Sequence, residues 1–156
     1  MNLKVQTMTF DGAVLNRGYW LYLWRITSGA NLFIYVGRTG DSSSNNAGSP
    51  FTRIGNHLDS RPTAKGNSLW KQLTKEKVNP QKCNFEMTAI GPIFPEEKET
   101  TKHRERRDQM AALEREISNY LKTSGFKVLG VHHSNKRNDQ NLIDSVINVI
   151  NERFKL

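Results

Sequence analysis

Two runs of aromatic and aliphatic residues constrain the fold of this chain more than any other feature of its sequence. The first run, YWLYLWRI, occupies residues 19–26, and the second, LFIYVG, occupies residues 32–37. Dense aromatic and β-branched side chains favour β-strands, because they pack well on a pleated surface. The segment between the runs, SGAN at residues 28–31, is rich in residues that favour turns. The two runs therefore predict an antiparallel β-hairpin.

Other segments with regular apolar spacing predict the remaining strands and helices. Alternation indicates a strand at residues 85–90 and an additional N-terminal strand from Leu3 to Phe10, and residues 126–132 could form another short strand. Helical spacing predicts four helices, which begin at Pro50, run from Ser68 to Lys77, run from about Pro95 to Leu121, and occupy residues 139–155. The expected fold class is α/β (α+β), with a small, mainly antiparallel three-stranded sheet flanked by helices, an extra N-terminal strand and a C-terminal helix.

Length and cysteine content bound the domain number and the compartment. The chain has 156 residues, which suits one core because domains commonly hold roughly 100–150 residues. We therefore expect a single domain over residues 1–156. The only cysteine, Cys83, excludes an internal disulfide and favours a reducing compartment. With neither an apolar run long enough to span a membrane nor a secretion signal, the expected location is the cytoplasm, without a membrane partner.

Basic residues outnumber acidic ones by 23 to 15, which gives a formal net charge of +8. An excess of this size favours a polyanionic partner, because counterion release and long-range steering both strengthen its binding. Charge alone does not select a class of partner, since many basic proteins never bind nucleic acid. A nucleic-acid partner therefore has to be inferred from particular residues.

Polar residues spread over most of the chain follow the order and spacing of a known enzyme family. Tyr22 ends the sequence WLY in the first predicted strand, and Tyr35 begins YVG in the second. Further on, TRIGNH supplies Arg53 and His57, which lie four residues apart and hence on one face of a helix. These motifs resemble the GIY-YIG endonuclease family over roughly residues 18–135. The first motif departs from the family, because Trp-Leu replaces Gly-Ile.

The family also has a glutamate on a later helix, and this chain offers two. Glu114 and Glu116 stand two residues apart, about 200° around a helix, so both cannot face one site. The resemblance favours Glu116, because the family's glutamate tends to be followed four residues later by an apolar residue, and Tyr120 fills that place. Glu114 is the reserve. An asparagine near the end of the family domain has no clear counterpart, and His132 or His133 could take its position.

The resemblance implies a metal-dependent endonuclease that hydrolyses phosphodiester bonds of double-stranded DNA at a one-metal site. Mg²⁺ or Mn²⁺ held by Glu116 would neutralise the phosphate and stabilise the leaving 3′ oxygen. Arg53 would bind the phosphate oxygens. Tyr22 is the candidate general base if Arg53 or the metal favours its phenolate, whereas His57 could accept the proton directly or relay it. Tyr35 would orient the water or the phosphate.

Two basic residues are candidates for binding the DNA backbone, and two other functions remain open. Arg38 directly follows YVG and Lys71 lies on the second predicted helix, although ordinary solubilising charge explains each about as well. One alternative function is a catalytically silent GIY-YIG-like nucleic-acid-binding module, which the presence of all five polar site residues argues against. The other is a protein-interaction domain whose C-terminal helix forms a homodimer, although such an apolar stripe more often packs in a core.

Overall fold

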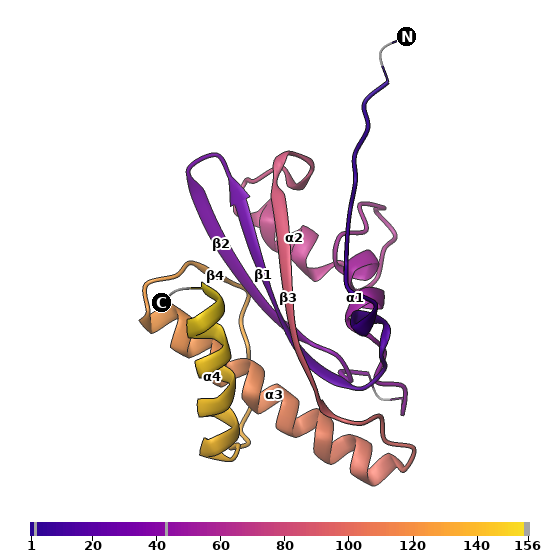
Figure 1. Cartoon of the computed structure of the whole chain (residues 1–156), viewed down its shortest axis with the longest axis vertical. Coiled ribbons are helices and arrows are strands. Elements are labelled where there is room, and N and C mark those ends of the chain that lie inside the picture. The colour runs from indigo at the N-terminus through magenta and orange to yellow at the C-terminus, as the bar shows by residue number, and fades with distance from the viewer. Residues whose placement is uncertain (2, 43, 155–156) are drawn as a thin grey trace.

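A four-stranded sheet with the strand order β3-β1-β2-β4 lies at the centre of the computed structural model, which describes residues 1, 3–42 and 44–154 (Figure 1). The strands are Tyr19–Ser28 (β1), Asn31–Arg38 (β2), Asn84–Phe94 (β3) and Val128–Leu129 (β4). β1 pairs antiparallel with β2 and with β3, whereas β4 is parallel to β2. The predicted hairpin is confirmed, and the sheet has one strand more than the three expected.

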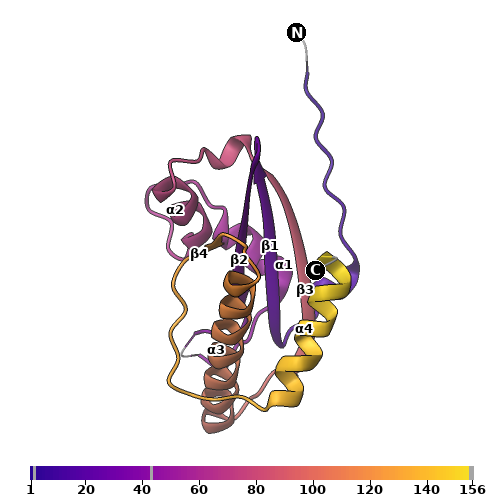
Figure 2. The ribbon, with the colours of Figure 1, turned by 90° about the vertical axis from the view of Figure 1, so that its left-hand side faces the viewer.

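Helices cover both faces of this sheet. The elements outside it are Gly12–Leu15 (η1), Pro50–His57 (α1), Ser68–Lys75 (α2), Pro80–Lys82 (η2), Thr100–Thr123 (α3) and Gln140–Phe154 (α4). Because side chains alternate along a strand, β1 directs Tyr22 and Trp24 to the core shared with α1 and α2, and Leu21 and Leu23 to the core shared with α3 and α4. Figure 2 shows α2 and α4 on opposite sides of the sheet. The expected α/β (α+β) fold class is confirmed.

The expected N-terminal strand does not form. Residues 3–9 run away from the sheet in an extended path (Figure 1), and Leu3 and Val5 are 77% and 85% exposed. Alternation gives the apolar side chains a common face, but a strand also needs a neighbouring strand to pair with, and no described strand pairs with this segment. The end of the segment does approach the rest of the chain: Met8 lines a pocket with Phe51, and the ring centroid of Phe10 lies 4.9 Å from that of Phe51 on α1. The extra strand is instead β4, within residues 126–132.

The long helix α3 begins at Thr100 and not near Pro95. Glu96 lies before it and accepts hydrogen bonds from Arg17 at 2.6 and 3.0 Å and from the backbone N–H of Ala47 at 3.0 Å. These contacts stabilise a non-helical segment at Glu96, which accounts for the later start of the helix.

The C-terminal helix α4 uses its apolar stripe inside the chain. It corresponds to the expected helix at residues 139–155, of which residue 155 lies outside the described residues. Ile143, Val146 and Ile150 are buried in the core with α3. Within the described ranges, no helix has the length and apolar character to cross a membrane.

Candidate active site

Four of the expected site residues belong to one hydrogen-bonded network on the α1–α2 side of the sheet. The hydroxyl of Tyr22 on β1 lies 2.6 Å from Nε2 of His57 on α1. Nε of Arg53 donates to the same hydroxyl at 3.2 Å. Tyr35 on β2 joins through Ser68 on α2, whose hydroxyl oxygen lies 2.9 Å from the Tyr35 hydroxyl and 2.9 Å from Nδ1 of His57. The fold thus brings together side chains from two strands and two helices.

Local sequence features place these side chains. Ser49 caps the N-terminus of α1, and the four-residue spacing of Arg53 and His57 then directs both toward the sheet. The glycine of YVG is needed for the approach of Tyr22, because a Cβ atom on Gly37 would lie 2.4 Å from the Tyr22 ring. That separation is far inside van der Waals contact, so any side chain at this position would displace the ring.

Burial sets the protonation states of Tyr22 and His57. Tyr22 is fully buried, and this burial raises the pKa of its hydroxyl, although Arg53 acts in the opposite direction. The neutral phenol is therefore favoured, because the effect of burial outweighs the expected promotion of the phenolate by Arg53. Burial, followed by the charge of Arg53, lowers the pKa of His57 to about 4. His57 is thus a neutral imidazole at pH 7, with one ring nitrogen able to accept a proton.

The low pKa of His57 predicts a loss of stability on acidification. An unfolded chain binds a proton at His57 below about pH 6.5, whereas the folded protein does so only near pH 4. Between these values the unfolded state holds more protons, so stability is complete above pH 6.5 and falls as the pH drops to 4, by about 3 kcal/mol in total. Urea unfolding at pH 7, 5 and 4 measures this loss. His57→Gln should show a shallower decline, and identical pH profiles for the two proteins would contradict the prediction.

Two members of the network were not identified from the sequence. Asp41, in the loop after β2, forms an ion pair with Arg53 at 2.8 Å. Ser68 is the first residue of α2. Serine and aspartate are common in loops and at helix starts, where they serve the backbone, so neither carried a signal of its own. Asp41 thus neutralises part of the charge of the Arg53 guanidinium.

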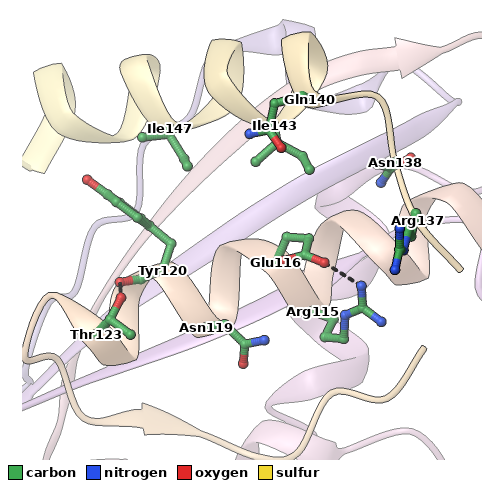
Figure 3. Close-up of a pocket in the computed structure, with 10 residues that line it drawn as sticks. All are labelled: Arg115, Glu116, Asn119, Tyr120, Thr123, Arg137, Asn138, Gln140, Ile143 and Ile147. Carbon is green, nitrogen blue, oxygen red and sulfur yellow. Dashed lines mark hydrogen bonds and ion pairs between the residues drawn. The ribbon is translucent and has the colours of Figure 1, made fainter. Parts of the chain in front are cut away.

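Glu116 lies outside this site, and its assignment is corrected. It lines a separate pocket of about 440 Å³ between α3 and α4, where it forms an ion pair with Arg115 (Figure 3). Tyr120, the residue whose position four places later favoured Glu116 in the sequence, donates a hydrogen bond to the side chain of Asn151 on α4 at 2.6 Å. Glu116 and Tyr120, which are four residues apart, therefore share the side of α3 that faces α4 and not the side that faces the network.

Glu114, the reserve candidate, lies beside the network. It lines a pocket of about 320 Å³ together with Tyr35 and Ser68. One carboxylate oxygen accepts from Nε of Arg38 at 3.1 Å, and the other lies 3.5 Å from Nδ1 of His132. The reserve residue is thus the one next to the tyrosine and serine of the network.

The donors in this pocket fit a divalent cation. The described part of the chain contains no cluster of three or more His, Cys, Asp or Glu side chains suited to a metal. Mg²⁺ does not require one, since it usually keeps several waters and binds one or two carboxylates together with substrate phosphate. Glu114 supplies the carboxylate. Nδ1 of His132 faces the same carboxylate at 3.5 Å, so His132 orients Glu114 and does not share a metal with it through Nε2.

The two residues expected to bind DNA differ in their surroundings. Arg38 is largely buried, holds Glu114 and also donates to the carbonyl of Arg107 at 3.5 Å. Lys71 is exposed on α2, next to Gln72, which lines the pocket of Glu114. Lys71 is therefore accessible to a DNA backbone, whereas Arg38 is engaged within the site.

Comparisons of the chain with protein-family models, with curated proteins and with solved structures gave no match. Function is therefore inferred from the chemistry that the site could perform. Arg53 provides a cation for an anionic group, and His57 provides a neutral base. Glu114 provides a carboxylate for a metal. This combination suits hydrolysis of a phosphate ester, which needs a base for water and positive charge at the phosphate.

Proposed function

We propose that the protein is a metal-dependent endonuclease that hydrolyses phosphodiester bonds of double-stranded DNA, as its resemblance to the GIY-YIG family implies. The observation that carries the proposal is the convergence of Tyr22, Tyr35, Arg53 and His57, distant in sequence, in one hydrogen-bonded network. A structural role alone does not explain why a guanidinium, an imidazole and two phenols meet there, next to the pocket of Glu114.

In this proposal the phosphate lies between Arg53 and Glu114. Arg53 exchanges its ion pair with Asp41 for the phosphate oxygens, which its planar donors suit. Glu114, oriented by His132 and Arg38, would hold Mg²⁺ or Mn²⁺. When bound, the metal supplies positive charge that stabilises the crowded phosphate and the leaving 3′ oxygen.

His57 is the proposed base. Its neutral imidazole is available at pH 7, whereas Tyr22 is buried and its pKa is raised. Binding of the phosphate also improves this base, because the charge of Arg53, which lowers the pKa of His57, is then offset by the anion. The role of Tyr22 is to hold His57 and Arg53 in place.

DNA is the proposed polyanion and the cytoplasm the proposed location. The net charge of +8 favours binding to a phosphate backbone, and Lys71 beside the pocket would contribute to it. Arg38 would bind the backbone only after leaving Glu114. One site of this kind cuts one strand at a time, so cleavage of both strands requires two successive cuts or a homodimer.

One observation favours the alternative, a catalytically silent GIY-YIG-like nucleic-acid-binding module. Arg38 already pairs with Glu114 at 3.1 Å, and the positive charge of its guanidinium opposes binding of a metal cation to the same carboxylate. In a silent module the pair would persist when DNA binds.

Cleavage of supercoiled plasmid in the presence of Mg²⁺ or Mn²⁺, against an EDTA control, tests the proposed function. We expect the metal to produce nicked plasmid first and linear plasmid later, because a single site cuts one strand at a time. Pooled random-sequence duplexes should be included, so that a missing recognition sequence does not resemble inactivity. A folded protein that binds these DNAs but leaves all of them uncut would favour the silent module.

A further inference from the structure

Ser68 connects Tyr35 and His57 and has no evident role in its own helix. It begins α2, but the N-cap position belongs to Asn67. Its hydroxyl oxygen lies 2.9 Å from Nδ1 of His57 and 2.9 Å from the Tyr35 hydroxyl. A hydroxyl carries one proton and can also accept, so it can receive a hydrogen bond from one neighbour and donate to the other. The direction of these two bonds determines what the connection can do.

The contacts of Tyr22 allow one consistent arrangement of these bonds. Nε of Arg53 can only donate to the Tyr22 hydroxyl, at 3.2 Å. The carbonyl of Arg38 can only accept from it, at 3.2 Å. In the arrangement in which Tyr22 gives its single proton to this carbonyl, Nε2 of His57 donates across the 2.6 Å contact. Nδ1 of His57 then carries the lone pair, Ser68 donates to it, and Tyr35 donates to Ser68.

We propose that Ser68 is a positioning residue of the proposed nuclease, which accepts a hydrogen bond from Tyr35 and donates one to Nδ1 of His57. The proton lost by the attacking water then passes inward from Tyr35 to His57. This inference rests on the proposed function, and it adds a residue and a direction of proton transfer to it.

Proton transfer along this path is balanced. As water gives a proton to the Tyr35 oxygen, Tyr35 passes its own proton to Ser68, and Ser68 passes its proton to Nδ1 of His57. The resulting hydroxide forms a bond to phosphorus, the bond from phosphorus to the 3′ oxygen breaks, and the leaving oxygen takes a proton from solvent. His57 is left as an imidazolium and returns its proton to solvent along the same path after the product leaves.

Exposure agrees with Tyr35 as the outer end of the path. Tyr35 is 8% exposed and lines the pocket that contains Glu114, whereas Tyr22 is fully buried. A water next to the metal donors can therefore reach Tyr35 but not Tyr22. The lowered pKa of His57 keeps its imidazole neutral, and so able to accept a proton, before the reaction.

Nitrogen NMR of the histidine rings tests the direction of the hydrogen bonds whether or not the protein cuts DNA. Resonances of His57 are assigned by their loss in His57→Gln. In the wild type at pH 7 we expect a proton on Nε2 and none on Nδ1. In Ser68→Ala, the Nδ1 resonance should shift toward that of a free, unprotonated nitrogen, whereas in Thr74→Ala, which removes another hydroxyl from α2, it should not. A proton on Nδ1 in the wild type would mean that the path runs outward and would overturn the proposal.

Cleavage rates test the use of the path. We expect Ser68→Ala to cut about a hundredfold more slowly, at the lower end of what proton transfer contributes, and Ser68→Thr to keep most of the activity because it retains the hydroxyl. Ser68→Ala combined with Tyr35→Phe should be no slower than the slower single variant, since both interrupt one path. Cleavage by folded Ser68→Ala at the wild-type rate would refute the relay while leaving the nuclease proposal intact. A wild type without cleavage would instead refute the nuclease and, with it, the relay.

Discussion

Glu114→Gln is expected to reduce metal-dependent cleavage at least a hundredfold while the protein remains folded. The substitution removes the carboxylate charge proposed to hold the metal. A hundredfold loss of rate corresponds to about 2.7 kcal/mol, and a metal that polarises a phosphate stabilises the transition state by several kcal/mol. The fold should persist, because a glutamine oxygen can still accept the hydrogen bond that Arg38 donates at 3.1 Å. Single-turnover cleavage of plasmid at saturating protein measures the loss.

Glu116→Gln is the matched control for this experiment. It lies on the same helix and loses the same charge, but Glu116 faces α4 and pairs with Arg115. We expect this variant to cut at the wild-type rate. The opposite result, loss in Glu116→Gln and not in Glu114→Gln, would return the role to the residue favoured by the sequence and would reject the site described here.

Much of the fold could be predicted from the sequence because it depends on local patterns. The hairpin of β1 and β2 follows from two dense apolar runs and a short turn, and α4 follows from apolar residues at helical spacing. The N-terminal segment shows where such patterns fail. Its alternation is as regular as that of a strand, but hydrogen bonding to a neighbour is not a local property, and Leu3 and Val5 remain exposed.

The candidate site could be predicted only where spacing along the chain decides which side chains meet. Arg53 and His57 share a helix face because they are four residues apart, and the hairpin register then sets Tyr22 and Tyr35 on the same face of the sheet. The choice between Glu114 and Glu116 depended on how α3 is rotated against the sheet.

Two other features of the site depend on tertiary structure alone. The position of Ser68 results from the packing of α2 against β2, which brings its hydroxyl to Tyr35. The pairing of Glu114 with Arg38 joins residues 76 positions apart. Such contacts depend on how whole helices and strands pack together, and residue spacing within one segment does not predict that packing.

Arg53→Ala is expected to lower the cleavage rate by about 10²–10³-fold, the range found when a preorganised donor to a transition-state oxyanion is removed. Arg53→Lys should recover only part of the rate, because an ammonium keeps the charge but lacks the planar fork that matches phosphate oxygens. The loss should fall on the single-turnover rate, with DNA affinity changed only a few-fold, since one cation among 23 basic residues contributes little to binding the backbone.

Arg61→Ala separates this effect from the simple loss of a positive charge near the site. Arg61 lies in the loop between α1 and α2, its side chain is 77% exposed, and it pairs with Asp59. We expect its removal to leave the cleavage rate within about twofold of the wild type, because exposed ion pairs contribute little. Equal losses in Arg53→Ala and Arg61→Ala would mean that Arg53 acts through net charge, whereas a loss confined to Arg53→Ala would support direct contact with the phosphate. Arg53 also contacts Tyr22 and Asp41, so its removal could unfold the protein. Unfolding curves for both variants are therefore needed to show that a slower variant is still folded.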